Sequence, residues 1–385
     1  MDTQFNVLFA TATAGVSSFL MCIVILLTQP LHAGFSMDSD LNSIQKFHSR
    51  PVPRIGSVAL MVGLLAIPLY IYLFQQNISL RHYAQPMLFA VLAAVPAFAT
   101  GLLEDITKTV SVRARLIATF LSALLGAWLL GASLNRVDVI GLDFLLQFTP
   151  LSLVVTAIAV GGVANSVNII DGFNGIASGV VIVILAGIAY LAYLVDDTVV
   201  MHLCLAGMGA AIGFALVNFP TGRLFMGDGG AYLLGFWIGE MAVLLVVRNA
   251  QVSAWQLFAI CAYPIIEVLF SMYRRRVIRK VAPGAPDRLH LHTLIYRRFI
   301  CTRIPAHPQK DWIRNAAVAC LIVPWVAVTT TIAVRYGQTV GGAFLIALFQ
   351  AFVYLAVYGR LVRGRWCLRP MVLLGLRRVS KETAV

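Results

Sequence analysis

Long apolar stretches, separated by short polar gaps, run along almost the whole chain. A stretch of about 17–25 apolar residues is long enough to cross a bilayer as a helix. Such stretches lie near residues 6–28, 55–75, 85–103, 114–132, 149–167, 176–195, 198–217, 231–248, 254–272, 315–334 and 340–358. The pattern predicts an all-α fold: a polytopic transmembrane bundle of about eleven helices, with a tight hairpin at residues 196–197.

The composition supports a single membrane domain. The chain is 60% hydrophobic and only 12% charged, whereas a typical soluble protein carries about 25% charged residues. We therefore expect a transmembrane domain over residues 1–358 and a basic cytoplasmic tail over residues 359–385. The six cysteines are scattered, which argues against a disulfide framework or a cysteine metal site. The residues before the first apolar run lack Lys and Arg, so that run is expected to be a permanent helix.

The basic residues predict an orientation. With these helices, 25 of the 29 Lys and Arg residues lie on one side of the membrane. The other side holds Arg81, Arg136, Arg248 and Arg335. Basic loops stay in the cytoplasm, so the N-terminus is predicted to be outside and the C-terminus inside. The net charge of +13 is then explained by anionic membrane lipid, and no nucleic-acid partner is expected.

Polar residues gather at the predicted cytoplasmic helix ends. One string closes the third apolar stretch with Glu104 and Asp105. Adjacent carboxylates at a membrane interface are costly unless they are paired or bind a metal. The alternative is a solvated loop with a helix cap.

A second polar string begins at Asn165, which is followed at intervals of three by Asn168 and Asp171. On a helix these side chains share one face. Gly172 and Gly175 would let backbone approach a ligand closely. A helix end followed by a turn is the plainer interpretation, because Asn, Asp and Gly are turn residues.

A third string runs from Asn218 through Phe225 to Asp228, which stands between glycines just before a predicted helix. Mg²⁺ prefers oxygen ligands and needs only one or two carboxylates beside substrate phosphates. The helix start would offer free N–H groups to a phosphate. Taken alone, the string could be an ordinary turn.

Two further strings are basic. Residues 286–292 hold Arg288, His290 and His292, after an arginine run at 274–276, and could contact a phosphate or a metal. Residues 46–56 hold His48 and Arg54. For both strings the alternative is a patch that faces anionic lipid.

Together, in this order, the five strings resemble the polyprenyl-phosphate N-acetylhexosamine-1-phosphate transferase family, in particular its undecaprenyl-phosphate N-acetylglucosamine-1-phosphate transferase branch (glycosyltransferase family 4). The resemblance covers residues 40 to 300. It implies a multi-pass enzyme of the bacterial cytoplasmic (inner) membrane with a cytoplasmic active site. Such an enzyme transfers N-acetylhexosamine 1-phosphate from a UDP-N-acetylhexosamine to undecaprenyl phosphate, releases UMP and uses Mg²⁺ or Mn²⁺. This step begins an O-antigen, teichoic acid or exopolysaccharide, and a homodimer is left open.

The resemblance also implies roles for the residues of these strings. Catalytic roles fall on Glu104, Asp105, Asp171, His290 and His292, with the carboxylate pair at the lipid phosphate and the histidines at the diphosphate. Metal contacts fall on Asp228 and Asn168. Substrate contacts fall on His48, Arg54, Asn165, Asn174, Asn218, Phe225 and Arg288, with Asn218 and Phe225 at the uridine.

The chain departs from the family pattern at Glu104, Asn174 and Thr293, where Asp, Asp and His are usual. These departures leave the choice of sugar open and allow an inactive relative. The missing third histidine argues against the phospho-N-acetylmuramoyl-pentapeptide transferase branch, which remains the alternative enzyme. A transporter is the other alternative, although Glu240 and Glu267 are the only acidic residues expected inside the helices.

Overall fold

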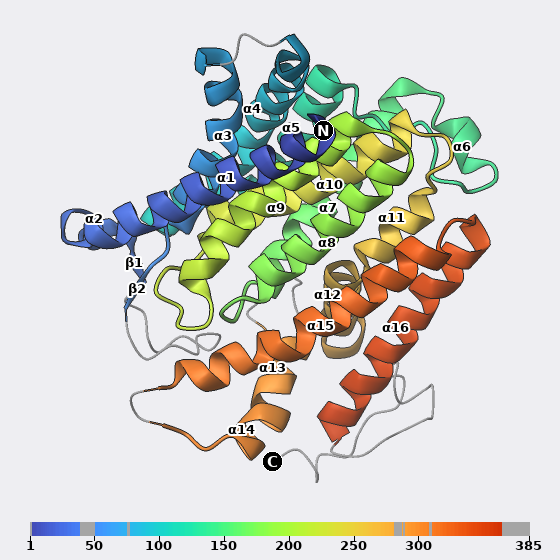
Figure 1. The fold of residues 1–385 in the computed structure, drawn as a ribbon. Coiled ribbons are helices and arrows are strands. Elements are labelled where there is room, and N and C mark those ends of the chain that lie inside the picture. The colour runs from blue at the N-terminus through green and yellow to red at the C-terminus, as the bar shows by residue number, and fades with distance from the viewer. Residues whose placement is uncertain are drawn as a thin grey trace.

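The structure is a computed structural model that describes residues 2–38, 51–74, 78–280, 287, 289–307 and 310–363. Within these residues it is mostly helical (Figure 1). The long helices are α1 (Asp2–Leu27), α3 (Gly56–Phe74), α4 (Ile78–Thr107), α5 (Val112–Leu130), α7 (Thr149–Ile170), α8 (Ile176–Leu194), α9 (Thr198–Asn218), α10 (Gly227–Arg248), α15 (Trp312–Tyr336) and α16 (Val340–Arg363). The shorter helices are α2 (Gln29–Ser36), α6 (Leu142–Leu145), α11 (Ala254–Ile260), α12 (Ala262–Tyr273), η1 (Arg274–Arg279), α13 (Leu291–Ile295), η2 (Tyr296–Ile300) and α14 (Cys301–Arg303).

The predicted bundle of about eleven helices is confirmed. Ten helices of the described chain are long and apolar enough to span a membrane, and a bent pair makes an eleventh. The tight hairpin is also confirmed, because α8 ends at Leu194 and α9 begins at Thr198. Asp197 closes this hairpin by accepting a hydrogen bond from the backbone N–H of Val200 at 3.1 Å.

The prediction of one continuous helix over residues 254–272 is wrong. The segment is broken after Ile260, and α11 meets α12 and η1 at an angle of 82°. Pro264 lies in the first turn of α12. Proline has no N–H to donate to the carbonyl four residues earlier, and its ring crowds that carbonyl, so an unbroken helix is unfavourable here.

A small two-stranded sheet also departs from a purely helical fold. Strands β1 (Met37–Asp38) and β2 (Val52–Pro53) pair antiparallel, with Met37 opposite Pro53 and Asp38 opposite Val52. Each strand has only two residues, too few for the alternation of apolar and polar side chains that marks a strand in a sequence. The sheet leads the chain into α3.

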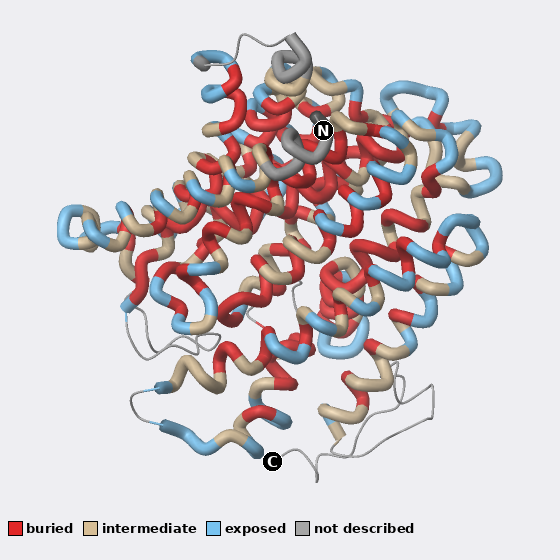
Figure 2. The backbone as a smooth tube through the Cα atoms, in the orientation of Figure 1, coloured by how far each residue is buried: buried red, intermediate tan, exposed pale blue. Residues whose placement is uncertain are grey.

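Helix α10 forms the centre of the molecule, and α3, α4, α5, α7, α8 and α9 pack around it. Buried residues accordingly concentrate in the middle of the bundle, whereas exposed residues lie on its outside (Figure 2). Small residues bring the helices close: on α9, Gly209 and Gly213 lie directly against the backbone of α1. Close backbone packing through small residues is typical of membrane helices, which gain little from hydrophobic burial against each other.

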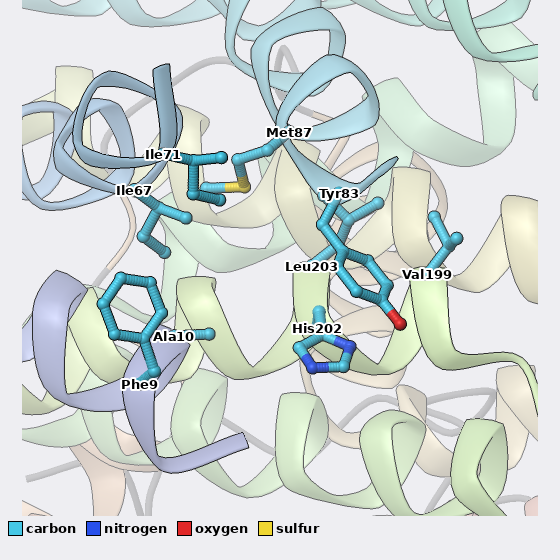
Figure 3. Close-up of a pocket in the computed structure, with 9 residues that line it drawn as sticks. All are labelled: Phe9, Ala10, Ile67, Ile71, Tyr83, Met87, Val199, His202 and Leu203. Atoms are coloured by element: carbon cyan, nitrogen blue, oxygen red, sulfur yellow. The ribbon is translucent and has the colours of Figure 1, made fainter. Parts of the chain in front are cut away.

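A small apolar cavity lies among α1, α3, α4 and α9 (Figure 3). Its lining includes His202, whose Nδ1 lies 2.6 Å from the carbonyl oxygen of Thr198. The cavity lies near the ends of these helices that are farther from Asp105 and Asp228. It is therefore separate from the site described next.

Candidate active site

The first part of the site is the contact between the end of α4 and the start of α10. Asp105 is buried, and its two carboxylate oxygens accept hydrogen bonds from the backbone N–H groups of Asp228 and Gly229, both at 2.9 Å. These N–H groups belong to the first turn of α10, which has no partner for them within the helix. Asp105 thus holds the N-terminus of the central helix.

A close approach of two glycines makes this contact possible. A Cβ on Gly101 would lie 2.6 Å from both the backbone N and the Cα of Gly229. Gly227 has a φ of +70°, a conformation that other residues rarely adopt. The glycines of both strings therefore serve to bring Asp105 against α10.

Two arginines from other segments reach the same place. The Nη2 atom of Arg54, just after β2, lies 3.2 Å from Asp105 Oδ1 and 3.6 Å from Asp228 Oδ1. Arg115, in the first turn of α5, forms an ion pair with Asp228 and lies over the ring of Tyr232 at 6.0 Å. Neither Arg115 nor Tyr232 stood among the predicted site residues. Arg115 was visible in the sequence because it follows the first string.

Glu104 points elsewhere than its neighbour. Its Oε2 accepts a hydrogen bond from the backbone N–H of Val110 at 2.7 Å, which closes the loop between α4 and α5. The longer side chain of Glu spans this loop, and this gives a physical reason for Glu at a position where the family usually has Asp. Glu104 is half-buried, whereas Asp105 is fully enclosed.

The second string ends α7. Asn165 and Asn168 are half-buried residues of α7, and the Asn168 Nδ2 donates to the hydroxyl of Tyr232 at 3.3 Å. Asp171 is the C-terminal cap residue of the helix rather than a residue of its last turn. Burial raises the pKa of Asp171 to about 7, although the positive charge of Arg54 opposes the rise. Asp171 can therefore exchange a proton near neutral pH.

Asn174 and Asn218 connect the loops around this string. Asn218 accepts from the backbone N–H of Gly175 at 2.8 Å and donates to the carbonyl of Leu224 at 2.8 Å. The Nδ2 of Asn174 donates to the carbonyl of Pro220 at 3.0 Å. Both amides are thus engaged with backbone and shape the loop between α9 and α10.

Phe225 lies in the same loop and is half-buried. Its backbone N–H donates to the carbonyl of Pro53 at 2.9 Å, and its carbonyl accepts from the N–H of Gly56 at 3.0 Å. The third string is therefore tied to the segment that carries Arg54. Asp228, predicted to precede a helix, lies inside the first turn of α10, because Gly227 already begins the helix.

The histidines lie next to the second string. The rings of His290 and His292 are stacked with centroids 5.3 Å apart, and the His292 ring meets Phe173 edge-on at 5.8 Å. A Cβ on Gly172 would lie 3.2 Å from His292 Nε2. Burial is the main cause that lowers the pKa of His292 to about 4, so this ring is neutral at pH 7.

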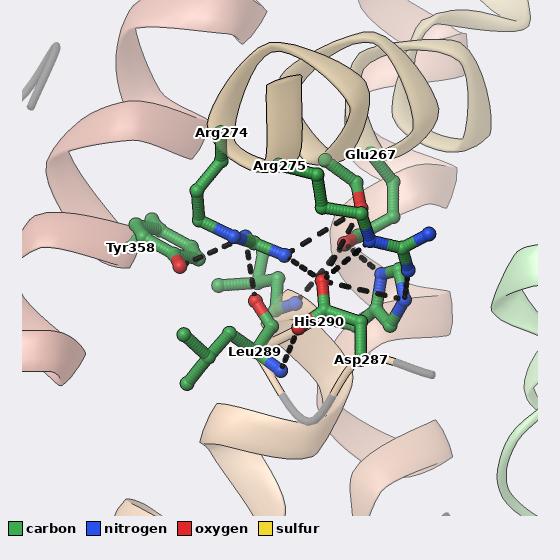
Figure 4. A network of polar contacts seen from close by, with 9 residues as sticks. Glu267, Arg274, Arg275, Asp287, Leu289, His290 and Tyr358 are labelled. Atoms are coloured by element: carbon green, nitrogen blue, oxygen red, sulfur yellow. Dashed lines mark hydrogen bonds and ion pairs between the residues drawn. The ribbon is translucent and has the colours of Figure 1, made fainter. Parts of the chain in front are cut away.

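A buried polar network holds the segment that contains Asp287, Leu289 and His290, which we call the histidine loop (Figure 4). Its hub is the Asp287 carboxylate, which accepts from Arg274, from Arg275 Nε at 3.2 Å and from the backbone N–H of Leu289 at 3.0 Å. Burial alone would raise the pKa of Asp287, but the arginines and His290 outweigh it and lower the pKa to about 2. Asp287 was missed by the sequence analysis, although it adjoins Arg288.

The network also contains Glu267, which the sequence analysis set aside as a helix residue. Its Oε1 lies 2.9 Å from His290 Nδ1. Arg274 donates to the carbonyl of Leu289 and to the Tyr358 hydroxyl, both at 2.8 Å, and so links α16 to the loop. A carboxylate within an apolar helix was the sequence signal for a functional or paired residue.

The structure thus forms two neighbouring clusters at one end of the bundle, and each combines predicted residues with residues that were not predicted. The carboxylate cluster contains Arg54, Asp105, Arg115 and Asp228, and the histidine cluster contains Glu267, Asp287, His290 and His292. Asp171 and Gly172 lie between the two clusters. The positive charge of Arg54 acts on the pKa of Asp171, and Gly172 lies against the His292 ring. His48 and Arg288 lie outside the described residues.

The oxygen donors of the carboxylate cluster fit a small divalent cation. Asp228 is half-buried at a helix start, and its carboxylate oxygens face the guanidinium groups of Arg54 and Arg115, which shows that positive charge is accommodated there. Nowhere in the described chain do three or more His, Cys, Asp or Glu residues form a metal cluster. A cation that keeps waters and substrate phosphates as ligands, as Mg²⁺ does, needs no such cluster.

The fold and the site define a class: a multi-pass membrane protein whose carboxylates, arginines and histidines gather at one end of the bundle. Comparison with known proteins is more specific. Residues 87–246 match the family described as glycosyl transferase family 4. This match and the relatives described below support that family and a phosphotransferase enzyme. The matched residues include the three strings that contain Asp105, Asp171 and Asp228, but they end before His290.

Several curated relatives agree with this family. A probable undecaprenyl-phosphate N-acetylglucosaminyl 1-phosphate transferase of Bacillus subtilis is 26% identical and covers 66% of this chain and 68% of its own length. An undecaprenyl-phosphate alpha-N-acetylglucosaminyl 1-phosphate transferase of Thermotoga maritima is 27% identical, and the aligned region covers 66% of this chain and 71% of the relative. The Salmonella typhi protein of the same name is 24% identical, and the aligned region covers 89% of this chain and 88% of the relative.

Proposed function

We propose that this enzyme transfers an N-acetylhexosamine 1-phosphate group from a UDP-sugar to undecaprenyl phosphate and releases UMP. The observation that carries the proposal is the convergence of Arg54, Asp105, Arg115 and Asp228, from four separate segments, at the start of α10. Phosphoryl transfer depends mainly on positioning and on neutralising charge. The names of the relatives support undecaprenyl phosphate as the acceptor.

In this proposal the acceptor phosphate oxygen attacks the phosphorus that carries the sugar. The P–O bond to UMP breaks, UMP leaves with the electron pair, and a polyprenyl diphosphate sugar remains. Donor and acceptor are both anionic and repel each other. Arg54 and Arg115 offset that repulsion where they meet Asp228.

A divalent cation, Mg²⁺ or Mn²⁺, would neutralise negative charge on the donor diphosphate when bound. Asp228 and Asn168 would hold it, and both present oxygen donors next to Tyr232 or the arginines. Asp105 and Glu104 would serve the lipid phosphate. Asp171, whose pKa is raised to about 7 by burial, would act close to the metal and the nucleotide.

The remaining predicted contacts concern the donor. Phe225 would stack on the uracil, and Asn218 would shape that pocket through its bonds to the surrounding loop. His290 and His292 would lie at the diphosphate. Further substrate contacts are proposed for Asn165, Asn174, Arg54, His48 and Arg288.

The cellular setting is also proposed. The positive-inside rule supports an outside N-terminus, an inside C-terminus and an active site on the cytoplasmic face of the bacterial inner membrane. The reaction would begin a cell-envelope glycan such as an O-antigen, a teichoic acid or an exopolysaccharide.

The test is a donor panel. Purified protein in detergent is incubated with undecaprenyl phosphate, Mg²⁺ and one of several UDP-N-acetylhexosamines or UDP-N-acetylmuramoyl-pentapeptide, and UMP and the lipid product are measured. We expect both products with a UDP-N-acetylhexosamine. Turnover only with the pentapeptide donor would favour the alternative branch. UMP release without a lipid product would contradict transfer.

A further inference from the structure

Glu267 is a buried carboxylate to which the proposed reaction assigns no role. It lies in α12, and its side chain is completely buried. A carboxylate in such a position is costly unless it is satisfied by donors. Its Oε1 lies 2.9 Å from His290 Nδ1, and both of its oxygens lie 3.2 Å from the backbone N–H of Leu291. Each oxygen is therefore engaged at the start of the histidine loop.

These contacts determine the protonation of the His290 ring. A carboxylate can only accept, so the Nδ1 atom of His290 carries a proton and donates it to Glu267. The Nε2 atom of His290 then lies 3.3 Å from Nη2 of Arg275 and 4.0 Å from Oδ2 of Asp287. Glu267 thus directs Nε2 of His290 away from α12 and toward the charged side of the loop (Figure 4).

The orientation of His290 extends to the rest of the site. The His290 ring is stacked on the His292 ring, with an angle of 6° between the planes. His292 in turn lies against Gly172, next to Asp171. A rotation of His290 would therefore disturb the contact between the histidine cluster and the second string.

We propose that Glu267 is a positioning residue that holds the His290 ring with Nδ1–H on Glu267 and Nε2 beside Arg275, and so fixes the orientation in which His290 serves the site. This inference rests on the proposed function, because it assumes that His290 serves the transfer reaction. Removal of a partner that orients a metal-ligating histidine typically changes activity by about 10- to 100-fold, and we expect an effect of the same order here. Glu267 would act through His290 and would not touch the substrate.

The chain offers a matched control in Glu240. This residue is also completely buried, lies in α10, packs against Gly126, and neither of its carboxylate oxygens has a hydrogen-bond partner. The same substitutions can therefore be made at both positions. Met keeps the length of Glu without an acceptor, and Gln keeps a neutral acceptor.

The kinetic test measures kcat and KM for Glu267→Gln, Glu267→Met, His290→Gln and the double variant Glu267→Met/His290→Gln. We expect kcat to fall about 10-fold for Gln and about 100-fold for Met, with KM for the donor changed less than about threefold. Glu267→Met should cost nothing further when His290 is already Gln. Glu240→Gln and Glu240→Met should stay within about threefold of wild type. Equal losses from Glu267→Met with and without His290 would overturn the proposal.

A second readout does not depend on turnover. Nitrogen NMR of histidine-labelled protein reports which ring nitrogen carries the proton, and His290→Gln identifies the signal. We expect an Nδ1–H signal for wild type and its loss in Glu267→Met, but not in Glu240→Met. An unchanged His290 signal in Glu267→Met would overturn the proposal. If wild type transfers no sugar phosphate, the proposed function fails, and the NMR result still decides whether Glu267 orients His290.

Discussion

Asp228 is the residue on which the proposed chemistry depends most. Its carboxylate meets two guanidinium groups at the start of the central helix. Asp228→Asn removes the charge but keeps a residue that is favoured near helix N-termini. We therefore expect Mg²⁺-dependent turnover to disappear while the thermal unfolding midpoint changes little.

The control for this variant is Asp196→Asn. Asp196 lies in the hairpin between α8 and α9 with a φ of +58°, where Asn is tolerated as well as Asp. This change should leave turnover intact. Near-normal activity of Asp228→Asn would remove Asp228 from the metal role.

Asp105 and Glu104 are adjacent but are expected to respond differently to substitution. In Asp105→Asn an amide NH₂ would face the N–H groups of α10 or Arg54, and a buried donor without an acceptor costs about 1–3 kcal/mol. Glu104→Gln keeps an oxygen for the N–H of Val110. We expect Asp105→Asn to lose most of its turnover and several degrees of unfolding temperature, and Glu104→Gln to lose little.

Glu104→Asp completes this series. It restores the residue usual in the family, so turnover should persist, although the shorter arm draws away from Val110. All three variants are compared at saturating UDP-sugar. A dead Glu104→Gln beside an active Asp105→Asn would reverse the assignment of the two carboxylates.

The lowered pKa of His292 predicts how the free energy of unfolding depends on pH. Its pKa is about 4 in the fold, against an ordinary value of 6.5, so the unfolded chain binds a proton first as the pH falls. The contribution of His292 to the free energy of unfolding is fully present above pH 6.5. It declines toward pH 4, by at most about 3 kcal/mol. We expect the unfolding temperature of wild type to fall over this range, and His292→Gln to flatten the fall.

The exposed His307 provides the comparison for His292. His307→Gln should leave the dependence of unfolding temperature on pH as it is in wild type. If His292→Gln and wild type show the same dependence, the ring of His292 is not buried in its neutral form.

At the scale of elements, the crossing of α4 and α10 positions the carboxylate cluster. Gly101→Ala would place a methyl group 2.6 Å from the backbone of Gly229, so the two helices must separate. Overpacking of this kind costs about 1–3 kcal/mol, and separation would also draw Asp105 away from α10. We expect a lower unfolding temperature and a loss of turnover.

Gly162→Ala is the matched control in α7, because a Cβ at Gly162 meets nothing within 4 Å. Alanine is the better helix former by about 1 kcal/mol, so this variant should be as stable as wild type or slightly more stable. Full turnover of Gly101→Ala would show that the helix crossing does not determine the geometry of the carboxylates.

At the scale of the whole molecule, the orientation in the membrane is the main prediction. The basic residues predict a cytoplasmic C-terminus and an external hairpin at residues 196–197. A reporter active only in the cytoplasm should give a signal when fused after Val385 and none when fused after Asp196. The opposite pattern would place the candidate site on the external face and would exclude a cytoplasmic nucleotide donor.

The sequence by itself determined the helices and most of the polar residues of the site. Apolar runs of sufficient length can satisfy their backbone in a bilayer only as helices, so the number of spans followed from hydrophobicity. Glu104, Asp105, Asp171, Asp228, His290 and His292 stood out because they lie in polar strings at the predicted cytoplasmic ends of these runs, and those strings together resemble one family.

Only the tertiary structure decided which of these residues meet and which partners they have. Hydrophobic patterning does not specify which helices are neighbours, so nothing in the sequence placed Arg115 against Asp228 or Glu267 against His290. The bend at Cys261 was missed because both halves are apolar, although Pro264 was a sequence signal for it. Such pairings depend on close packing between segments far apart in the chain, where a glycine at position 101 matters as much as any charge.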